Sequence, residues 1–144
     1  MSENVKAYTG DRPYIFISYA HKDSEQVLAV IRRLQNDGYR VWYDEGIAPG
    51  TAWDQNIAEH LHGCTCFLSF ISESYVNSSN CRDEMSYCRK NGKSALMIYL
   101  EKVELSSGMK MRYGRFFSVF KYSSTEDAMF EKIYSLADIE KTKE

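Results

Sequence analysis

Glu84 is placed by its neighbours in the sequence at the edge of a buried helix face. Residues 79–92 read as one short helix. Its apolar side chains recur at helical spacing and form one stripe: Cys81, Met85 and Cys88. At about 100° per residue, Glu84 lies roughly 40° from Cys88, whereas Asp83 points to water. A carboxylate beside a buried face is costly unless a partner satisfies it or a reaction uses it, so Glu84 is the first candidate for chemistry.

An ordinary structural role explains the same residue. Ser79 or Asn80 can cap the start of this helix, and Gly92 can end it. Glu84 then falls in the first part of the helix, where the aligned amide dipoles favour negative charge. Capping, or a place at the rim, is therefore the alternative to catalysis. In both cases Glu84 is expected to be ionised.

Composition indicates one globular domain. The chain has 144 residues, 44% of them hydrophobic and 26% charged, with a formal net charge of −2. This balance predicts binding neither to nucleic acid nor to an anionic membrane. No apolar run is long enough to span a bilayer, and residues 1–12 lack the apolar core of a signal peptide.

The cysteines and histidines do not form a metal-binding pattern. Four cysteines contain no CxxC pair, and the three histidines are not at zinc-site spacing with them. We therefore expect no metal site and four reduced thiols that act as small apolar groups. Reduced thiols are typical of a cytoplasmic protein.

Strand-like and helical patterns alternate along the chain. Strands are predicted over residues 14–17, 39–43, 66–71, 95–100 and 117–120. Helices are predicted over residues 23–38, 51–63, 79–92 and 125–139, and residues 101–116 are predicted to be irregular. This order predicts an α/β fold, a flavodoxin-like doubly wound sheet of five parallel strands in the order 2-1-3-4-5, with helices on both faces.

Three segments are expected: a flexible N-terminal stretch over residues 1–11, one domain over residues 12–139, and a charged, frayed tail over residues 140–144. In doubly wound sheets, ligands bind beyond the carboxyl ends of the strands, where the strand order switches. Those ends carry residues 18–23, residues 44–50 and the start of the Glu84 helix.

Five motifs, in this order and at consistent spacing, together resemble the Toll/interleukin receptor (TIR) domain in its bacterial form. They lie at residues 14–23, 38–44, 47–53, 71–75 and 80–84. Some TIR domains only assemble with other TIR domains. Others cleave the nicotinamide–ribose bond of NAD+, and these carry a glutamate where Glu84 stands. The resemblance thus implies an NAD+ nucleosidase of bacterial immune or antiphage signalling, with NAD+ as substrate and no cofactor. The alternative is a non-catalytic TIR–TIR interaction module.

The resemblance also assigns substrate-binding residues. It implies that the dinucleotide cleft is lined by Ser18, Tyr19, Ala20 and His21. Asp44 would orient a ribose or cap its loop, and Trp53 would stack on the substrate or anchor its helix in the core. His21 would meet a phosphate or be a solvated turn residue.

Two further features concern assembly and specificity. The loop through which TIR domains often contact one another corresponds to Gly46, Ile47, Pro49 and Gly50. We expect the full site to form in a homo-oligomer, with the loop of one copy near Glu84 of another. Asn80 is assigned to substrate binding, although many cleaving members have a tryptophan there, and Tyr75 or Trp53 are the candidates to supply the missing ring.

A third interpretation is a flavodoxin-like domain that binds FMN or accepts a phosphoryl group. The turn after the first strand lacks a loop rich in Gly, Ser and Thr for phosphate, and it lacks an acidic cluster for Mg²⁺. This interpretation is disfavoured.

Overall fold

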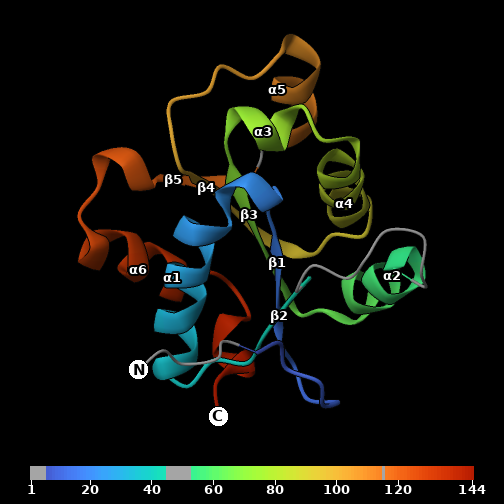
Figure 1. Ribbon diagram of the computed structural model, residues 1–144, viewed down its shortest axis with the longest axis vertical. Helices are drawn as coiled ribbons and strands as arrows, with labels where there is room; N and C mark the ends of the chain where they lie inside the picture. The colour runs from blue at the N-terminus through green and yellow to red at the C-terminus, as the bar shows by residue number, and fades with distance from the viewer. Residues whose placement is uncertain (1–5, 45–52, 115) are drawn as a thin grey trace.

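The computed structural model describes residues 6–44, 53–114 and 116–144, which fold around one parallel sheet (Figure 1). The strands are β1 Ile15–Ser18, β2 Val41–Tyr43, β3 Cys66–Ile71, β4 Ser94–Tyr99 and β5 Phe117–Phe120. They pair in parallel in the order β2-β1-β3-β4-β5. The predicted doubly wound, flavodoxin-like topology is confirmed.

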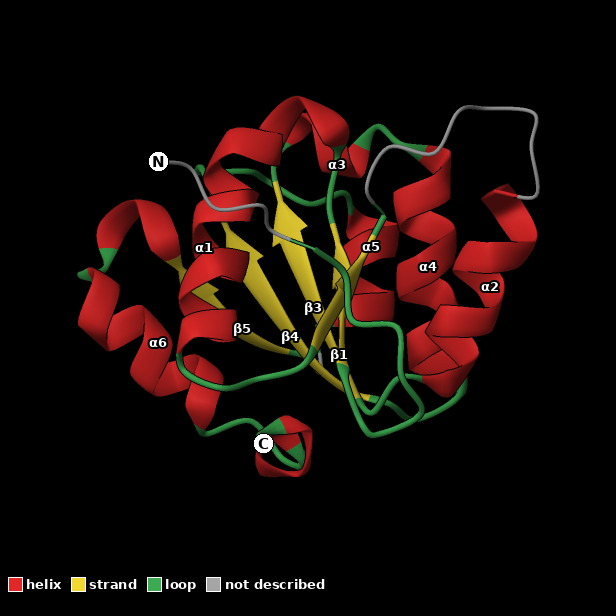
Figure 2. Cartoon of the chain, turned by 60° about the horizontal axis from the view of Figure 1, so that its bottom comes forward, coloured by secondary structure: helices red, strands yellow, loops and turns green. Residues whose placement is uncertain are grey.

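Helices cover both faces of the sheet, which explains why its central strands read as continuous apolar runs. Figures 1 and 2 show two of them on one side, α1 Ser24–Asn36 and α6 Glu126–Tyr134. The helices that pack on the other face are α2 Trp53–Gly63, α4 Ser79–Lys90 and α5 Ser107–Tyr113.

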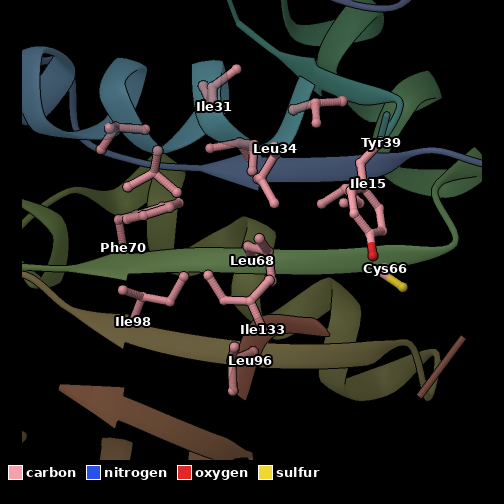
Figure 3. Close-up of a cluster of buried hydrophobic side chains, with 14 of the residues drawn as sticks. Ile15, Ile31, Leu34, Tyr39, Cys66, Leu68, Phe70, Leu96, Ile98 and Ile133 are labelled. Atoms are coloured by element: carbon pink, nitrogen blue, oxygen red, sulfur yellow. The ribbon is translucent and has the colours of Figure 1, made fainter. Parts of the chain in front are cut away.

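The alternation of side chains along β3 divides the core into two clusters. Leu68 and Phe70 point to the α1 and α6 side, where Figure 3 shows them with Ile31 and Ile133. Phe67 lies in the other cluster, together with the apolar stripe of α4. That stripe is the predicted one, since Cys81, Met85 and Cys88 are all buried.

Two element predictions are wrong. Residues 107–113 form α5 inside the stretch predicted to be irregular, because Met109 and Tyr113, four residues apart, are buried on the same side. The last helix ends at Tyr134, not at residue 139. It is followed by Asp138 in the left-handed region (φ 71°) and by the short 3₁₀ helix η3, Ile139–Thr142.

The charged tail is attached to the domain, contrary to the expected fraying. The backbone N–H of Arg40 donates to the Thr142 carbonyl at 2.8 Å, and that of Glu144 donates to the Gly38 carbonyl at 2.9 Å. Before β1, the N–H of Tyr8 donates to the Val41 carbonyl at 2.8 Å. Both ends of the described chain therefore pack beside residues 38–41, at the start of β2.

Some features are absent from the residues that the structure describes. No helix among them has the length and apolarity to cross a membrane. Within the same residues, no cluster of three or more His, Cys, Asp or Glu side chains could bind a metal ion. All four cysteines are buried and free.

Candidate active site

A pocket of about 240 Å³ lies at the carboxyl end of β1, where the strand order switches. It is lined by six of the predicted site residues: Tyr19, Ala20, His21, Asp44, Asn80 and Glu84. Ser18, also predicted, ends β1 and is buried next to Glu84. The topology therefore brings these segments together, as the sequence predicts for a doubly wound sheet.

Glu84 projects from the second turn of α4. Ser78, one residue earlier than predicted, caps this helix, and its side chain accepts a hydrogen bond from the Cys81 N–H at 3.2 Å. The first turn, residues 79–82, is fully described and carries no acidic side chain. The expectation that the helix N-terminus keeps Glu84 ionised is therefore wrong, because Glu84 lies beyond the terminal amides.

The Glu84 carboxyl group has one short hydrogen bond and an unfavourable setting for its charge. Its Oε1 accepts from Ser18 Oγ at 2.6 Å. Burial raises the pKa of Glu84 from 4.5 to about 7; the Ser18 hydrogen bond opposes this rise, and the negative charges of Asp44 and Asp83 add to it. At neutral pH the group is therefore divided between its ionised and protonated forms.

Ser18 is itself held by a second hydroxyl group. Its Oγ lies 2.8 Å from Tyr75 Oη, and Tyr75 is completely buried. Tyr75 belongs to the short helix α3, Glu73–Val76, which Ser72 caps. The suggestion that Tyr75 supplies an exposed ring in place of the missing tryptophan is thus wrong. Its role behind Ser18 was missed, since no pattern in the sequence links two residues 57 positions apart.

His21 and Asp44 form a pair at the rim of the pocket. His21 Nε2 lies 3.1 Å from Asp44 Oδ2, and the two side chains are 55% and 11% exposed. The ring of Tyr19 lies against that of His21, with ring centroids 5.3 Å apart, and its hydroxyl donates to the Asp44 carbonyl at 2.8 Å. Asp44 is therefore held beside the pocket, where the half-exposed His21 has it as a partner.

The remaining predicted residues are only partly among those that the structure describes. Asn80 lines the pocket from the first turn of α4. The loop residues Gly46, Ile47, Pro49 and Gly50 lie outside the described residues, and so does the side chain of Trp53, although α2 begins at that residue.

The arrangement supports chemistry at a centre that becomes positively charged. A desolvated carboxylate, fixed by one hydroxyl donor, faces a small pocket with a second carboxylate at its rim. In a site of low polarity, such a charge interacts with a developing cation more strongly than it would in water.

Comparison with known proteins shows where this architecture recurs. The TIR domain of the Toll-related receptor TRR-2 from Hydra magnipapillata superposes with a TM-score of 0.65 at 14% identity, over 83% of this chain and 93% of that one. The CMP N-glycosidase BcmB from Clostridium botulinum superposes with a TM-score of 0.58 at 15% identity, over 84% and 98%. At these identities the matches show a shared fold. No curated protein sequence matches significantly. The family model of the TIR domain matches residues 15–134, which is most of the chain, and the protein therefore belongs to the TIR domain family.

Proposed function

We propose that this TIR domain is an NAD+ nucleosidase in which Glu84 is the catalytic carboxylate. The observation that carries the proposal is the position of Glu84: its side chain is half-buried, its carboxyl group is held by Ser18 at 2.6 Å, and it faces the pocket at the strand-order switch. A glutamate with only a structural role at the helix rim has no need of that desolvation.

A single carboxylate can catalyse the cleavage of NAD+. The nicotinamide ring of NAD+ is cationic, so it takes the electrons of the broken ribose–nitrogen bond and leaves as a neutral molecule without needing a proton. Positive charge then develops on the ribose, as in glycoside hydrolysis, and water adds there with loss of a proton. A fixed carboxylate stabilises that charge more in the transition state than in bound NAD+, which accelerates the reaction. Asp44, at the pocket rim, is the candidate to orient the ribose hydroxyl groups.

A second candidate substrate is a nucleotide with a neutral base. BcmB, which has the same fold, is a CMP N-glycosidase. A neutral base is a poorer leaving group and benefits from protonation, and a carboxyl group with a pKa of about 7 can donate that proton. The two candidates predict opposite pH profiles. NAD+ cleavage rises with pH as Glu84 ionises, whereas release of a neutral base falls.

The setting proposed is immune signalling controlled by self-assembly. TIR domains act through contacts with other TIR domains, and we place the loop 46–50 of a neighbouring copy near Glu84. The check is the specific activity over a wide range of protein concentration. Activity that declines on dilution supports assembly, and constant activity argues against it.

The deciding experiment measures nicotinamide released from NAD+ by the concentrated protein, with the products separated by mass. Glu84→Gln is expected to reduce release at least about 100-fold, comparable to the loss of one key electrostatic donor. The matched control is Asp83→Asn, at the exposed neighbouring position on the same helix, which acts on Glu84 only through its charge. Measured at pH 8.5, where Glu84 is ionised in both proteins, it should leave release nearly unchanged. If the wild-type protein releases no nicotinamide, the non-catalytic interaction module is the better account.

A further inference from the structure

Two buried hydroxyl groups continue the hydrogen bonding of Glu84 into the core. Ser18 Oγ lies 2.6 Å from Glu84 Oε1 and 2.8 Å from Tyr75 Oη. Tyr75 Oη also lies 3.4 Å from the carbonyl oxygen of Cys81. A chain of oxygen atoms therefore connects three elements: α4, the end of β1 and the short helix α3.

The number of protons available to Tyr75, Ser18 and Glu84 determines which of them donates each hydrogen bond. An ionised Glu84 only accepts, so Ser18 gives its single hydroxyl proton to Glu84 and must accept the proton of Tyr75. When Glu84 is protonated and donates, Ser18 turns to Tyr75, whose proton is left with the longer contact to the Cys81 carbonyl. A phenol is a stronger donor and a weaker acceptor than an alcohol. The arrangement in which Tyr75 donates to Ser18 and Ser18 donates to Glu84 is therefore the more stable one.

We propose that Tyr75 is a positioning residue of this site, which orients the Ser18 hydroxyl toward the Glu84 carboxylate without touching the substrate. The proposal rests on the proposed function only in treating Glu84 as the reacting group. Tyr75 is suited to the role because it is completely buried, in the same core cluster as Met85 and Phe67, and such burial restrains its hydroxyl beside Ser18.

Other groups around Glu84 act on the same equilibrium and must stay constant in a test. Asp44, after β2, and Asp83, on α4, oppose ionisation of Glu84, and His21 of η1 (His21–Asp23) pairs with Asp44. The thiols of Cys81 and Cys88, on α4, sense the Glu84 charge but are buried with raised pKa values. Ser18 and Tyr75 can be changed without altering any of these residues.

The test is a carbon-13 NMR titration of the glutamate carboxyl groups in the full chain without substrate. The Glu84 signal is identified by its loss in Glu84→Gln. Ser18→Ala should raise the pKa of Glu84 by about one pH unit, because a hydrogen bond to the ionised form is lost. Tyr75→Phe should raise it by roughly half as much, because it weakens that bond only indirectly. The double variant should equal Ser18→Ala alone, since Tyr75 reaches Glu84 through Ser18.

Controls separate positioning from packing. Tyr87→Phe removes a hydroxyl from α4 that instead contacts His62 Nδ1 at 2.7 Å, and it should leave the Glu84 pKa unchanged. Ser18→Thr retains the hydroxyl and should keep the wild-type pKa. An unchanged pKa in Tyr75→Phe, or a further rise when it is added to Ser18→Ala, overturns the proposal.

A second variant covers the case in which Tyr75→Phe does not fold. Site-specific 3-fluorotyrosine at position 75 keeps the ring and makes its hydroxyl a stronger donor, so the Glu84 pKa should fall. A pKa that stays or rises overturns the proposal. Because the titration needs no turnover, a protein that fails to cleave NAD+ still gives the same result, and the two failures are distinguishable.

Discussion

Replacing Glu84 by glutamine should stabilise the folded protein at high pH. The pKa of Glu84 is raised from 4.5 to about 7 in the fold, so the folded state binds this proton more tightly than the unfolded state does. Below pH 4.5 both states are protonated and burial of the group costs little. As pH rises toward 7, the folded state alone retains the proton, and stability is lost progressively.

The expected change in the free energy of unfolding follows from the pKa shift of Glu84. A rise of about 2.5 pH units, at about 1.4 kcal/mol per unit, costs about 3 kcal/mol above pH 7. Solvent in the pocket screens part of this charge. We therefore expect the advantage of Glu84→Gln over the wild type to grow by about 2 kcal/mol between pH 5 and pH 8.5. Glutamine keeps the shape of the side chain and still accepts from Ser18, so little packing is lost.

The assay is urea unfolding at the two pH values, analysed as the difference between the variant and the wild type. Every other titrating group is common to both proteins, so its contribution largely cancels. Asp83→Asn, at the exposed neighbouring position, is the control and should change stability by less than about 0.5 kcal/mol at each pH. If Glu84→Gln destabilises the protein equally at both pH values, the carboxylate is well satisfied when ionised, and the reasoning from desolvation fails.

Two further predictions concern neighbours of this site and the frame that holds it. Asp44→Asn should lower the pKa of Glu84, seen in the same carbon-13 titration, because a negative charge that opposes its ionisation is removed; an unchanged pKa would show that the two carboxylates are not coupled. Arg40→Met should destabilise the fold by about 2 to 3 kcal/mol in urea unfolding, because buried Arg40 donates to the carbonyls of Pro13 at 2.7 Å and Lys141 at 3.0 Å. Arg33→Met is its control: Arg33 pairs with Asp37 and Glu126 at the surface, and a clearly smaller loss than in Arg40→Met is expected. Equal losses in the two variants would mean that the buried contacts of Arg40 add nothing.

The order of apolar runs determined most of the fold. Short strands that alternate with helical patterns leave few topologies once crossovers are right-handed, and the sheet order follows. The helical period also placed Glu84 correctly, at the edge of a stripe whose members are buried, with Asp83 exposed on the other side. These are local properties of the chain, since period and spacing fix which face of an element is buried.

Only the tertiary structure decided which partners meet at that face. Ser18 and Glu84 are 66 positions apart, and Tyr75 approaches Ser18 from a helix of only four residues. Tyr75 was a candidate to supply a ring to the substrate, whereas the fold buries it completely. The sequence predicted an ionised Glu84, whereas its pKa is raised to about 7, because desolvation by surrounding elements outweighs the local argument from the helix dipole. Periodicity states where a side chain points, but its hydrogen-bond partner and its dielectric surroundings come from distant segments that only folding brings together.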